Sequence, residues 1–282
     1  MTGPFVPVVG AVFSADIAVP EHEREVRFYS RVLSTGEKPL WREKDLMNNL
    51  GTPIIGLGAR SAEYANLPLQ WMPHIQVADV AVSVQRTLDL GGSVLMHAKA
   101  DDGKSQWAVL LDPNAAAFGI IPVVPAASIP SSASAALPGT GAPVGHICWL
   151  DLTVPDAAAT QDFYRQVVGW SVHPVEMDDG GEPYSDYNLF GRDGRPLARV
   201  RHARGTNVDL PCVWMIYLPV GGLAESLRRV EEGGGEVIKA MQREDGEYLY
   251  AAVRDPVGAC LALTAGEGWQ PGELHGRPGS SS

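Results

Sequence analysis

Residues 145–170 change from a strand-like to a helix-like pattern of apolar positions. Apolar and polar side chains alternate from Ile147 to Thr153, which predicts a strand. A Val-Pro-Asp turn follows, and Asp156 is suited to cap a helix whose apolar side carries Phe163, Tyr164, Val167 and Val168. This stretch therefore predicts a strand that leads directly into an amphipathic helix.

The same construction occurs 135 positions earlier: Gly10, Asp16, Val19, Pro20, Phe28 and Tyr29 match Gly145, Asp151, Val154, Pro155, Phe163 and Tyr164. A second set of matches is offset by 143 positions and includes Trp71-Met72 with Trp214-Met215, Gly91-Gly92 with Gly234-Gly235, and Asp112-Pro113 with Asp255-Pro256. Repeats of this length are whole domains, because solenoid repeats have periods of roughly 20 to 50 residues. The sequence therefore predicts a duplicated domain, with an insertion in the second copy between about Val168 and Pro211.

Each copy has the pattern of two units, each consisting of a strand, a helix and several further strands. In the first copy the strands 10–19 and 71–77 each precede a helix, and Asp79 is a plausible cap for the second helix. Gly91-Gly92 ends that helix, and apolar segments at 94–96, 107–111 and 118–121 follow as strands. We expect one domain over residues 8–124 and the other over 144–265. Residues 125–143, rich in Pro, Ala and Ser, read as a linker, and the polar tail 266–282 reads as disordered.

Composition and charge exclude some partners. With 22 Lys and Arg against 33 Asp and Glu, the net charge is -11, so the basic footprint that nucleic-acid binding requires is missing. No apolar run approaches a membrane span, and the N-terminus does not resemble a signal peptide, so we expect a cytoplasmic protein. Its three widely spaced cysteines indicate reduced thiols. The duplication provides domain pairing within one chain, so either a monomer or a homodimer is possible.

The repeated motifs resemble the vicinal oxygen chelate superfamily, which includes glyoxalases, bleomycin-resistance proteins and extradiol dioxygenases. The resemblance is carried by Phe28-Tyr29 and Phe163-Tyr164, by the Gly-Gly helix ends and by the closing Asp-Pro turns. The opening Gly145, Trp149, Asp151 and Leu152 resembles tandem members described as glyoxalase-like or hydroxylase-like. This resemblance implies an α+β fold of two tandem glyoxalase-like domains. Each would contain two βαβββ units that form a curled mixed sheet around a cavity.

Enzymes of this superfamily hold a divalent metal with His, Gln or Glu. Counting along the motifs places the corresponding positions at Ser14, Met72 and Gly119 in the first copy, and at Trp149, Met215 and Ala262 in the second. None of these residues is a good ligand for a hard divalent ion. We therefore expect no metal and no cofactor, which argues against the metal-dependent chemistry of the superfamily.

Alternation along the strands predicts which side chains face each cavity. In the first copy these are Ser14, Asp16, Gln70, Met72 and His74, with Trp107 near the mouth. In the second copy they are Trp149, Met215 and Tyr217, together with Tyr184, Tyr187, Tyr248 and Tyr250, whose parity the sequence does not fix. Trp71 and Trp214 have the opposite parity and are expected to pack under the helices.

His74 and Asp16 are the candidates for catalysis, since imidazole and carboxylate groups can transfer protons. Both also have ordinary structural interpretations, because a His on a strand can be satisfied locally. Asp16 and Asp151 could each make the same structural hydrogen bond in their own copy of the domain. The leading hypothesis is a metal-free protein that binds a small, largely apolar or planar molecule, such as an antibiotic or secondary metabolite. The alternatives are a metal-independent isomerase, lyase or hydroxylase-type enzyme, and a structural module with filled cavities.

Overall fold

The computed structural model describes residues 6–33, 54–128 and 147–265. The tail 266–282 and all of the predicted linker after residue 128 lie outside the described residues. The first part of that linker contains a short 3-10 turn, Ala126–Ser128.

The first domain contains the strand-helix-strand order that the apolar pattern predicts. Its described elements are β1 (Val12–Val19), α1 (His22–Val32), β2 (Ile54–Ala59), η1 (Ala62–Tyr64), β3 (Met72–Val77), α2 (Val80–Asp89), β4 (Ser93–Lys99), β5 (Ser105–Leu111) and β6 (Ala117–Pro122). The strands form one mixed sheet in the order β2-β1-β3-β6-β5-β4. Strand β1 is antiparallel to β3, and each is parallel to the other strand beside it. The two units of the domain therefore meet at the centre of the sheet.

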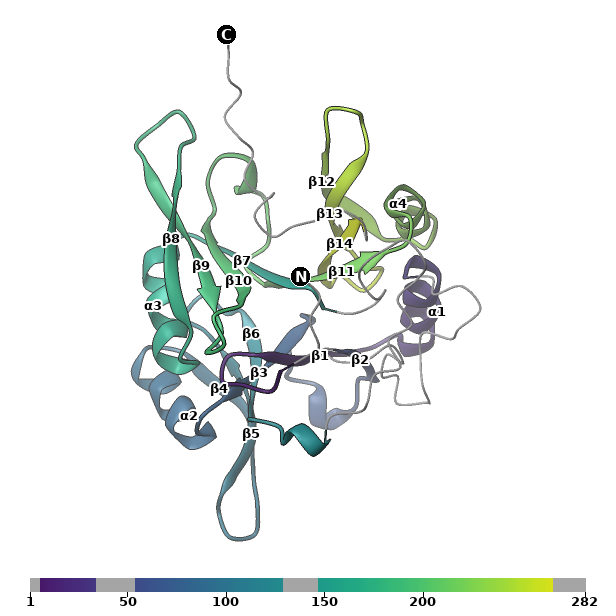
Figure 1. The fold of residues 1–282 in the computed structure, drawn as a ribbon. Coiled ribbons are helices and arrows are strands. Elements are labelled where there is room, and N and C mark those ends of the chain that lie inside the picture. The colour runs from purple at the N-terminus through teal and green to yellow at the C-terminus, as the bar shows by residue number, and fades with distance from the viewer. Residues whose placement is uncertain (1–5, 34–53, 129–146, 266–282) are drawn as a thin grey trace.

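The second domain repeats this arrangement. Its elements are β7 (Trp149–Val154), α3 (Ala157–Val167), β8 (Ser171–Met177), β9 (Tyr184–Phe190), β10 (Pro196–His202), η3 (Gly205–Asn207), β11 (Trp214–Val220), α4 (Leu223–Glu232), β12 (Glu236–Gln242), β13 (Tyr248–Arg254) and β14 (Cys260–Ala265). The sheet order is β12-β13-β14-β11-β7-β10-β9-β8. The hairpins β8–β9 and β12–β13 project from the same side of the molecule (Figure 1). The expected α+β fold with two curled mixed sheets is confirmed.

Local sequence signals explain where two of the helices begin. Asp79 and Asp156 are in extended conformation and accept backbone N–H groups from Val82 and Ala159, as N-cap residues do. None of the described helices has the length and apolar character that crossing a bilayer requires.

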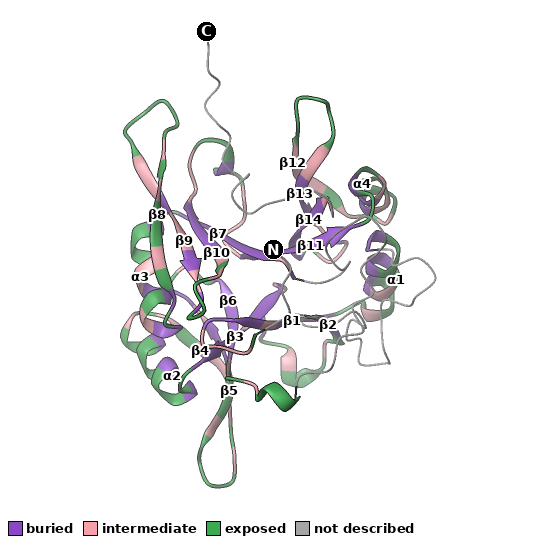
Figure 2. Cartoon of the chain, viewed as in Figure 1, coloured by how far each residue is buried: buried purple, intermediate pink, exposed green. Residues whose placement is uncertain are grey.

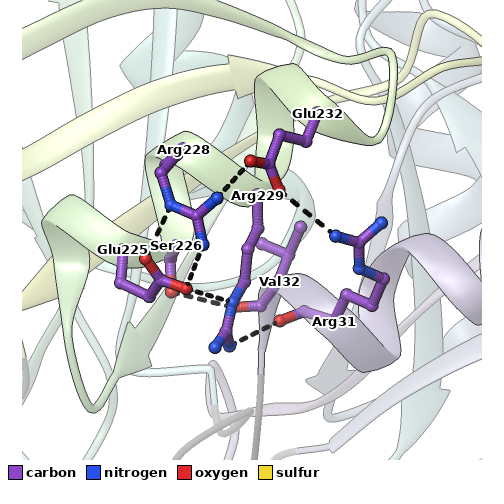
Figure 3. A network of polar contacts seen from close by, with 7 residues as sticks. All are labelled: Arg31, Val32, Glu225, Ser226, Arg228, Arg229 and Glu232. Carbon is purple, nitrogen blue, oxygen red and sulfur yellow. Dashed lines mark hydrogen bonds and ion pairs between the residues drawn. The ribbon is translucent and has the colours of Figure 1, made fainter.

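Helices from different domains pack together in pairs, α1 with α4 and α2 with α3, on opposite sides of the strands (Figure 1). At the first contact, Ser226 Oγ donates to the carbonyl of Val32 at 2.8 Å and Arg229 donates to that of Arg31 at 3.0 Å (Figure 3). At the second, Ser83 Oγ donates to the carbonyl of Val167 at 2.7 Å. These helix ends therefore bind one another as well as their own sheets.

The Asp of each Asp-Pro turn accepts a hydrogen bond from a tyrosine of the other domain. Tyr29 donates to Asp255 at 2.8 Å, and Tyr164 donates to Asp112 at 3.1 Å. Each tyrosine also accepts from a tryptophan of its own domain, Trp71 at 3.1 Å and Trp214 at 2.8 Å. Both tryptophans are fully buried, as their parity predicts.

One apolar core extends through both domains and includes residues of all four of these helices (Figure 2). Its aromatic centre contains Phe118, Phe163, Tyr164, Trp170 and Trp214 in edge-to-face or tilted contacts. The domains therefore share a core in addition to their polar contacts. The three cysteines are free, and burial raises the pKa of Cys148 to about 12.

Candidate functional site

A cavity of about 450 Å³ opens on the face of the first sheet to which Asp16 and His74 point. Its lining comes from β1, β2, β3, β4, β5 and β6 and from the η1 segment. The lining residues are Asp16, Ile17, Ala18, Gly56, Leu57, Gly58, Tyr64, Leu67, Met72, His74, Met96, Trp107, Ala108, Val109, Ile120 and Ile121. Most of this wall is apolar, and its carboxylate and imidazole groups come together at Asp16 and His74.

The strand register brings Ser14, Asp16 and His74 together. Ser14 lies directly opposite His74 on the antiparallel strands β1 and β3, and Asp16 lies opposite Met72. His74 Nδ1 is 3.1 Å from Asp16 Oδ2 and 3.0 Å from Ser14 Oγ. The His74 ring is therefore held from one side by two oxygen atoms of β1.

Gly119 on β6 makes room for this ring. It lies beside His74 in the parallel pairing of β3 and β6. A Cβ at position 119 would be 2.0 Å from Cδ2 and 2.8 Å from Nε2 of His74. The imidazole thus lies against the backbone of β6, where only glycine leaves enough space.

Burial lowers the pKa of His74, but the Asp16 carboxylate raises it more, so the net shift is upward from the ordinary value. Because an ionised carboxylate can only accept hydrogen bonds, we assign the Nδ1–H tautomer to the neutral ring. Nε2 is then the free acceptor. The arrangement can hold a proton at Nε2, with Asp16 stabilising the resulting imidazolium.

The apolar walls around this pair come partly from residues that alternation predicted and partly from residues that it missed. Met72 and Trp107 line the cavity as expected, and Trp107 keeps 37% of its surface exposed. Met96 and Tyr64 also line it and were not predicted. The parity of the β4 strand could have identified Met96, whereas Tyr64 belongs to a short 3-10 turn without a periodic signal.

Gln70 is not among the residues that line the cavity, so the prediction for it is wrong. Its side-chain carbonyl accepts from the backbone N–H of Ala117 at 2.9 Å, and its amide donates to the carbonyl of Ala115 at 3.3 Å. Gln70 precedes the start of β3, so the strict alternation that was assumed for it does not apply. Its role is to anchor the turn before β6.

In the second domain, described side chains pack together on the corresponding face. Trp149, Met215, Tyr217 and Tyr250 form a buried cluster with Ala252, Cys260 and Ala262. Trp149 Nε1 donates to Asp151 Oδ1 at 3.0 Å, and the hydroxyl of Tyr217 donates to Oδ2 at 2.7 Å. Arg201 forms a buried ion pair with the same carboxylate at 2.5 Å. Trp149 and Tyr217 therefore do face inward, but their polar groups are used in hydrogen bonds to the Asp151 carboxylate.

Burial and the nearby Asp151 carboxylate raise the pKa of Tyr217 far above its usual value. Burial lowers the pKa of Arg201, but Asp151, Tyr217, Tyr250 and Asp186 together raise it more. The Asp151 carboxylate is thus the centre of a buried network with one ion pair, to Arg201, and two hydrogen bonds, from Trp149 and Tyr217. The proposed shared role of Asp16 and Asp151 does not hold, because their partners differ.

Strand pairing shows why one face is open and the other is filled. Asp16 lies beside Gly56 on β2, whereas the equivalent Asp151 lies beside Arg199 on β10. The next inward positions are Gly58 in the first domain and Arg201 in the second. Together with Ser14 in place of Trp149, these glycines leave space in the first domain that large side chains occupy in the second.

The four tyrosines whose parity the sequence did not fix are distributed over both faces. Tyr250 lies in the inward cluster, with its ring 5.9 Å from that of Tyr217. Tyr187 and Tyr248 instead pack against the large core, so the prediction that they line the second cavity is wrong. Tyr187 is one residue out of phase with Asn188, which pairs with the inward Arg199. Tyr248 is separated from the inward Tyr250 by a bulge in the pairing of β12 and β13. The Tyr184 ring lies under the Arg204 guanidinium at 4.2 Å.

The residues at the expected metal positions do not fit a divalent ion. The register places His74, rather than Met72, between Ser14 and Gly119, and it places Tyr217 between Trp149 and Ala262. Each set thus has at most one good ligand, and Nδ1 of His74 is already engaged. Within residues 6–33, 54–128 and 147–265, no three His, Cys, Asp or Glu side chains are grouped so that they could hold a metal.

Comparison with known proteins agrees with the fold. The model of the Glyoxalase/Bleomycin resistance protein/Dioxygenase superfamily matches residues 144–263, and that of a Glyoxalase-like domain matches residues 13–121. The anthracycline biosynthesis protein DnrV of Streptomyces peucetius is 32% identical over 148 residues, which are 48% of this chain and 52% of that protein. The chain spans about half the length of the curated relatives it matches.

Solved structures share the architecture at low sequence identity. The Mn(II)-bound glyoxalase from Novosphingobium aromaticivorans has a TM-score of 0.56 at 14% identity, covering 93% of this chain and 83% of that one. A mutant of 4-hydroxymandelate synthase from Streptomyces coelicolor has a TM-score of 0.52 at 12% identity, covering 94% of each chain. With a matching family model in each half and this shared architecture, the chain belongs to the glyoxalase/bleomycin resistance protein/dioxygenase superfamily, as a member with two tandem domains.

Proposed function

We propose that the first domain binds a small, largely apolar, planar molecule of secondary metabolism in its cavity, and that it does so without a metal ion. The observation that carries the proposal is the cavity itself, whose largely apolar walls surround the carboxylate–imidazole pair of Asp16 and His74. Its volume of about 450 Å³ is within the range of roughly 300 to 1,000 Å³ typical of small-molecule sites.

The walls suit a flat aromatic ligand. Trp107 offers an indole that is partly exposed, and ring systems stack favourably on such surfaces. Met72 and Met96 add flexible thioethers, which adapt to irregular apolar shapes. The similarity to a protein named for anthracycline biosynthesis supports a polycyclic aromatic ligand.

Two features support binding without a metal. His74 is the one good ligand among the three adjacent strand positions of the first domain, and its Nδ1 faces Asp16 and Ser14. In the second domain, the carboxylate nearest the equivalent positions is occupied by Arg201, Trp149 and Tyr217. A ligand would therefore be held by apolar contact and by hydrogen bonding to the His74 side chain.

Isothermal titration of the purified protein with a panel of polycyclic aromatic compounds tests binding. We expect saturable binding of at least one compound, weakened about tenfold or more in Trp107→Ala and unchanged in Val208→Ala. Val208 is a suitable control because it is 60% exposed and lies in the second domain. The proposal fails if no cavity-sized compound binds, or if both variants bind as the wild type does.

The Asp16–His74 pair favours a second candidate, a metal-independent enzyme that moves a proton. Nε2 of His74 would accept a proton from an acidic position of the substrate, and Asp16 would stabilise the imidazolium. This role predicts that the protein accelerates exchange of such a proton in D2O, measured by NMR. It also predicts that His74→Gln abolishes the acceleration while leaving affinity within a few-fold. Exchange no faster than in buffer would leave binding alone as the function.

A further inference from the structure

The hydrogen bonds of His74 determine what kind of group it can receive. Its Nδ1 lies within 3.1 Å of a carboxylate oxygen of Asp16 and 3.0 Å of the Ser14 hydroxyl. A carboxylate accepts but does not donate, so the proton of the neutral ring is on Nδ1. Nε2 consequently presents a lone pair, and a ligand group that meets it must be a hydrogen-bond donor.

Nε2 is accessible. Among the described residues, no hydrogen bond to this atom is formed, and the buried polar atoms without partners include Asp16 Oδ1 but not His74 Nε2. The side chain of His74 keeps 20% of its surface exposed and belongs to the cavity wall. An apolar ligand without a donor would cover this nitrogen and leave it unpaired, which costs free energy.

We propose, on the basis of the binding function above, that the ligand is a phenol or hydroxyquinone whose acidic hydroxyl is placed at Nε2 of His74 and is bound as its anion. The O–H bond of the ligand breaks, the proton forms an N–H bond at Nε2, and the electron pair stays on the ligand oxygen. The Asp16 carboxylate faces the other nitrogen of the imidazolium. No electron transfer or further reactant is needed.

The surroundings favour this ligand over a carboxylate. A carboxylate ligand is less suitable, because Asp16 already has a buried oxygen without a partner and would repel a second compact negative charge. A delocalised phenolate spreads its charge over the rings that the apolar wall contacts. The upward shift of the His74 pKa agrees with an imidazolium stabilised in this position.

Absorption spectroscopy with a hydroxyanthraquinone tests the inference, because its ionised form absorbs at longer wavelength than its neutral form. The titration is made at a pH about one unit below the pKa of the free compound. We expect the wild-type protein to produce the spectrum of the anion on binding. His74→Gln should bind the compound without that shift, and Asp16→Asn should reduce the shift, whereas Val208→Ala should behave as the wild type.

Anthraquinone without a hydroxyl serves as the second probe. It should bind the wild type about tenfold more weakly than the hydroxylated compound does. It should bind His74→Gln as well as it binds the wild type. If both compounds bind and the bound hydroxyanthraquinone keeps its neutral spectrum, this inference is overturned while the proposed binding function stands. If neither compound nor any other polycyclic compound binds, the proposed function itself is wrong. Circular dichroism of both variants establishes that they are folded.

Discussion

Gly119 lies where any side chain would displace the imidazole that the cavity presents. In Gly119→Ala, the new methyl group would be 2.0 Å from Cδ2 of His74, so the ring must leave its place beside Asp16. Since Asp16 is the group that raises the pKa of His74, we expect that pKa to fall toward its ordinary value of 6.5. An NMR pH titration of the imidazole C–H signals measures it.

Gly58→Ala is the matched control, because its added Cβ would meet only the carbonyl of Ile17 at 3.8 Å. Its His74 should titrate as in the wild type. If His74 also keeps its wild-type pKa in Gly119→Ala, the contact between ring and strand backbone does not position the histidine.

A second residue-scale prediction concerns Glu25, which is fully buried on α1 and whose carboxylate oxygens have no partner among the described residues. Burial, and then the negative charge of Asp255, raise its pKa from 4.5 to about 8. The folded state thus holds a proton that the unfolded state releases, so stability is greatest below pH 4.5 and decreases as the pH rises to about 8.

The substitution Glu25→Gln removes this titration and keeps the shape of the side chain. We expect its thermal midpoint to exceed that of the wild type at pH 8.5, with a much smaller difference at pH 5. Glu23→Gln on the same helix changes a side chain that is 91% exposed, so it should alter neither value. Parallel pH dependence in Glu25→Gln and wild type would contradict the assignment.

Sequence patterns identified some site residues correctly, for reasons that differ from residue to residue. Met72 and His74 lie within a regular strand, where alternation determines which way a side chain points. Gln70, just before that strand, follows its local turn instead. Tyr248 lies beside a bulge in the pairing of β12 and β13, so its parity depends on pairing that sequence alone does not specify. Tyr187 lies on the inserted hairpin, for which the repeat provides no counterpart.

At the scale of elements, the closing turns do more than reverse the chain. The Asp-Pro pattern predicts a turn, and Asp112 does accept the backbone N–H groups of Asn114 and Ala116 within it. Its second oxygen accepts from Tyr164, which lies 52 positions further along the chain and in the other domain. A local pattern cannot indicate such a partner, so the link between domains emerges only from the structure.

Tyr164→Phe tests this link. It leaves buried groups of Asp112 and Trp214 without their partner, which typically costs ~1–3 kcal/mol per lost bond to a buried group. Urea unfolding should show that loss of stability. Tyr248→Phe removes a hydroxyl with no hydrogen bond among the described residues and should cost much less. Equal effects of the two changes would indicate that the Tyr164 hydroxyl contributes nothing.

At the scale of the whole molecule, duplication has produced two similar sheets with different inner faces. The succession of strands and helices along the chain was predictable from the repeated motifs, because both copies carry the same apolar pattern. Among the described residues, the size of the side chains on each inner face depends on substitutions at matched positions. Glycines at 56 and 58 in one domain correspond to Arg199 and Arg201 in the other.

This asymmetry predicts opposite consequences for two tryptophans. Trp149→Ala in the second domain should lower the free energy of unfolding by ~3–5 kcal/mol, because the indole is almost completely buried, and should leave ligand affinity unchanged. Trp107→Ala should instead weaken ligand binding and have little effect on the free energy of unfolding. Urea unfolding and calorimetric titration of both variants make the comparison. Lost ligand binding in a folded Trp149→Ala protein would place the site in the second domain.

We propose that the cavity beside His74 binds its ligand without a metal ion. The most direct test of metal-free binding is calorimetric titration of a binding polycyclic phenol into protein dialysed against a chelator, repeated after adding Mn²⁺, Fe²⁺, Ni²⁺ or Zn²⁺. We predict the same affinity and one site per chain in every case. Binding that appears only after a metal is restored would contradict the claim.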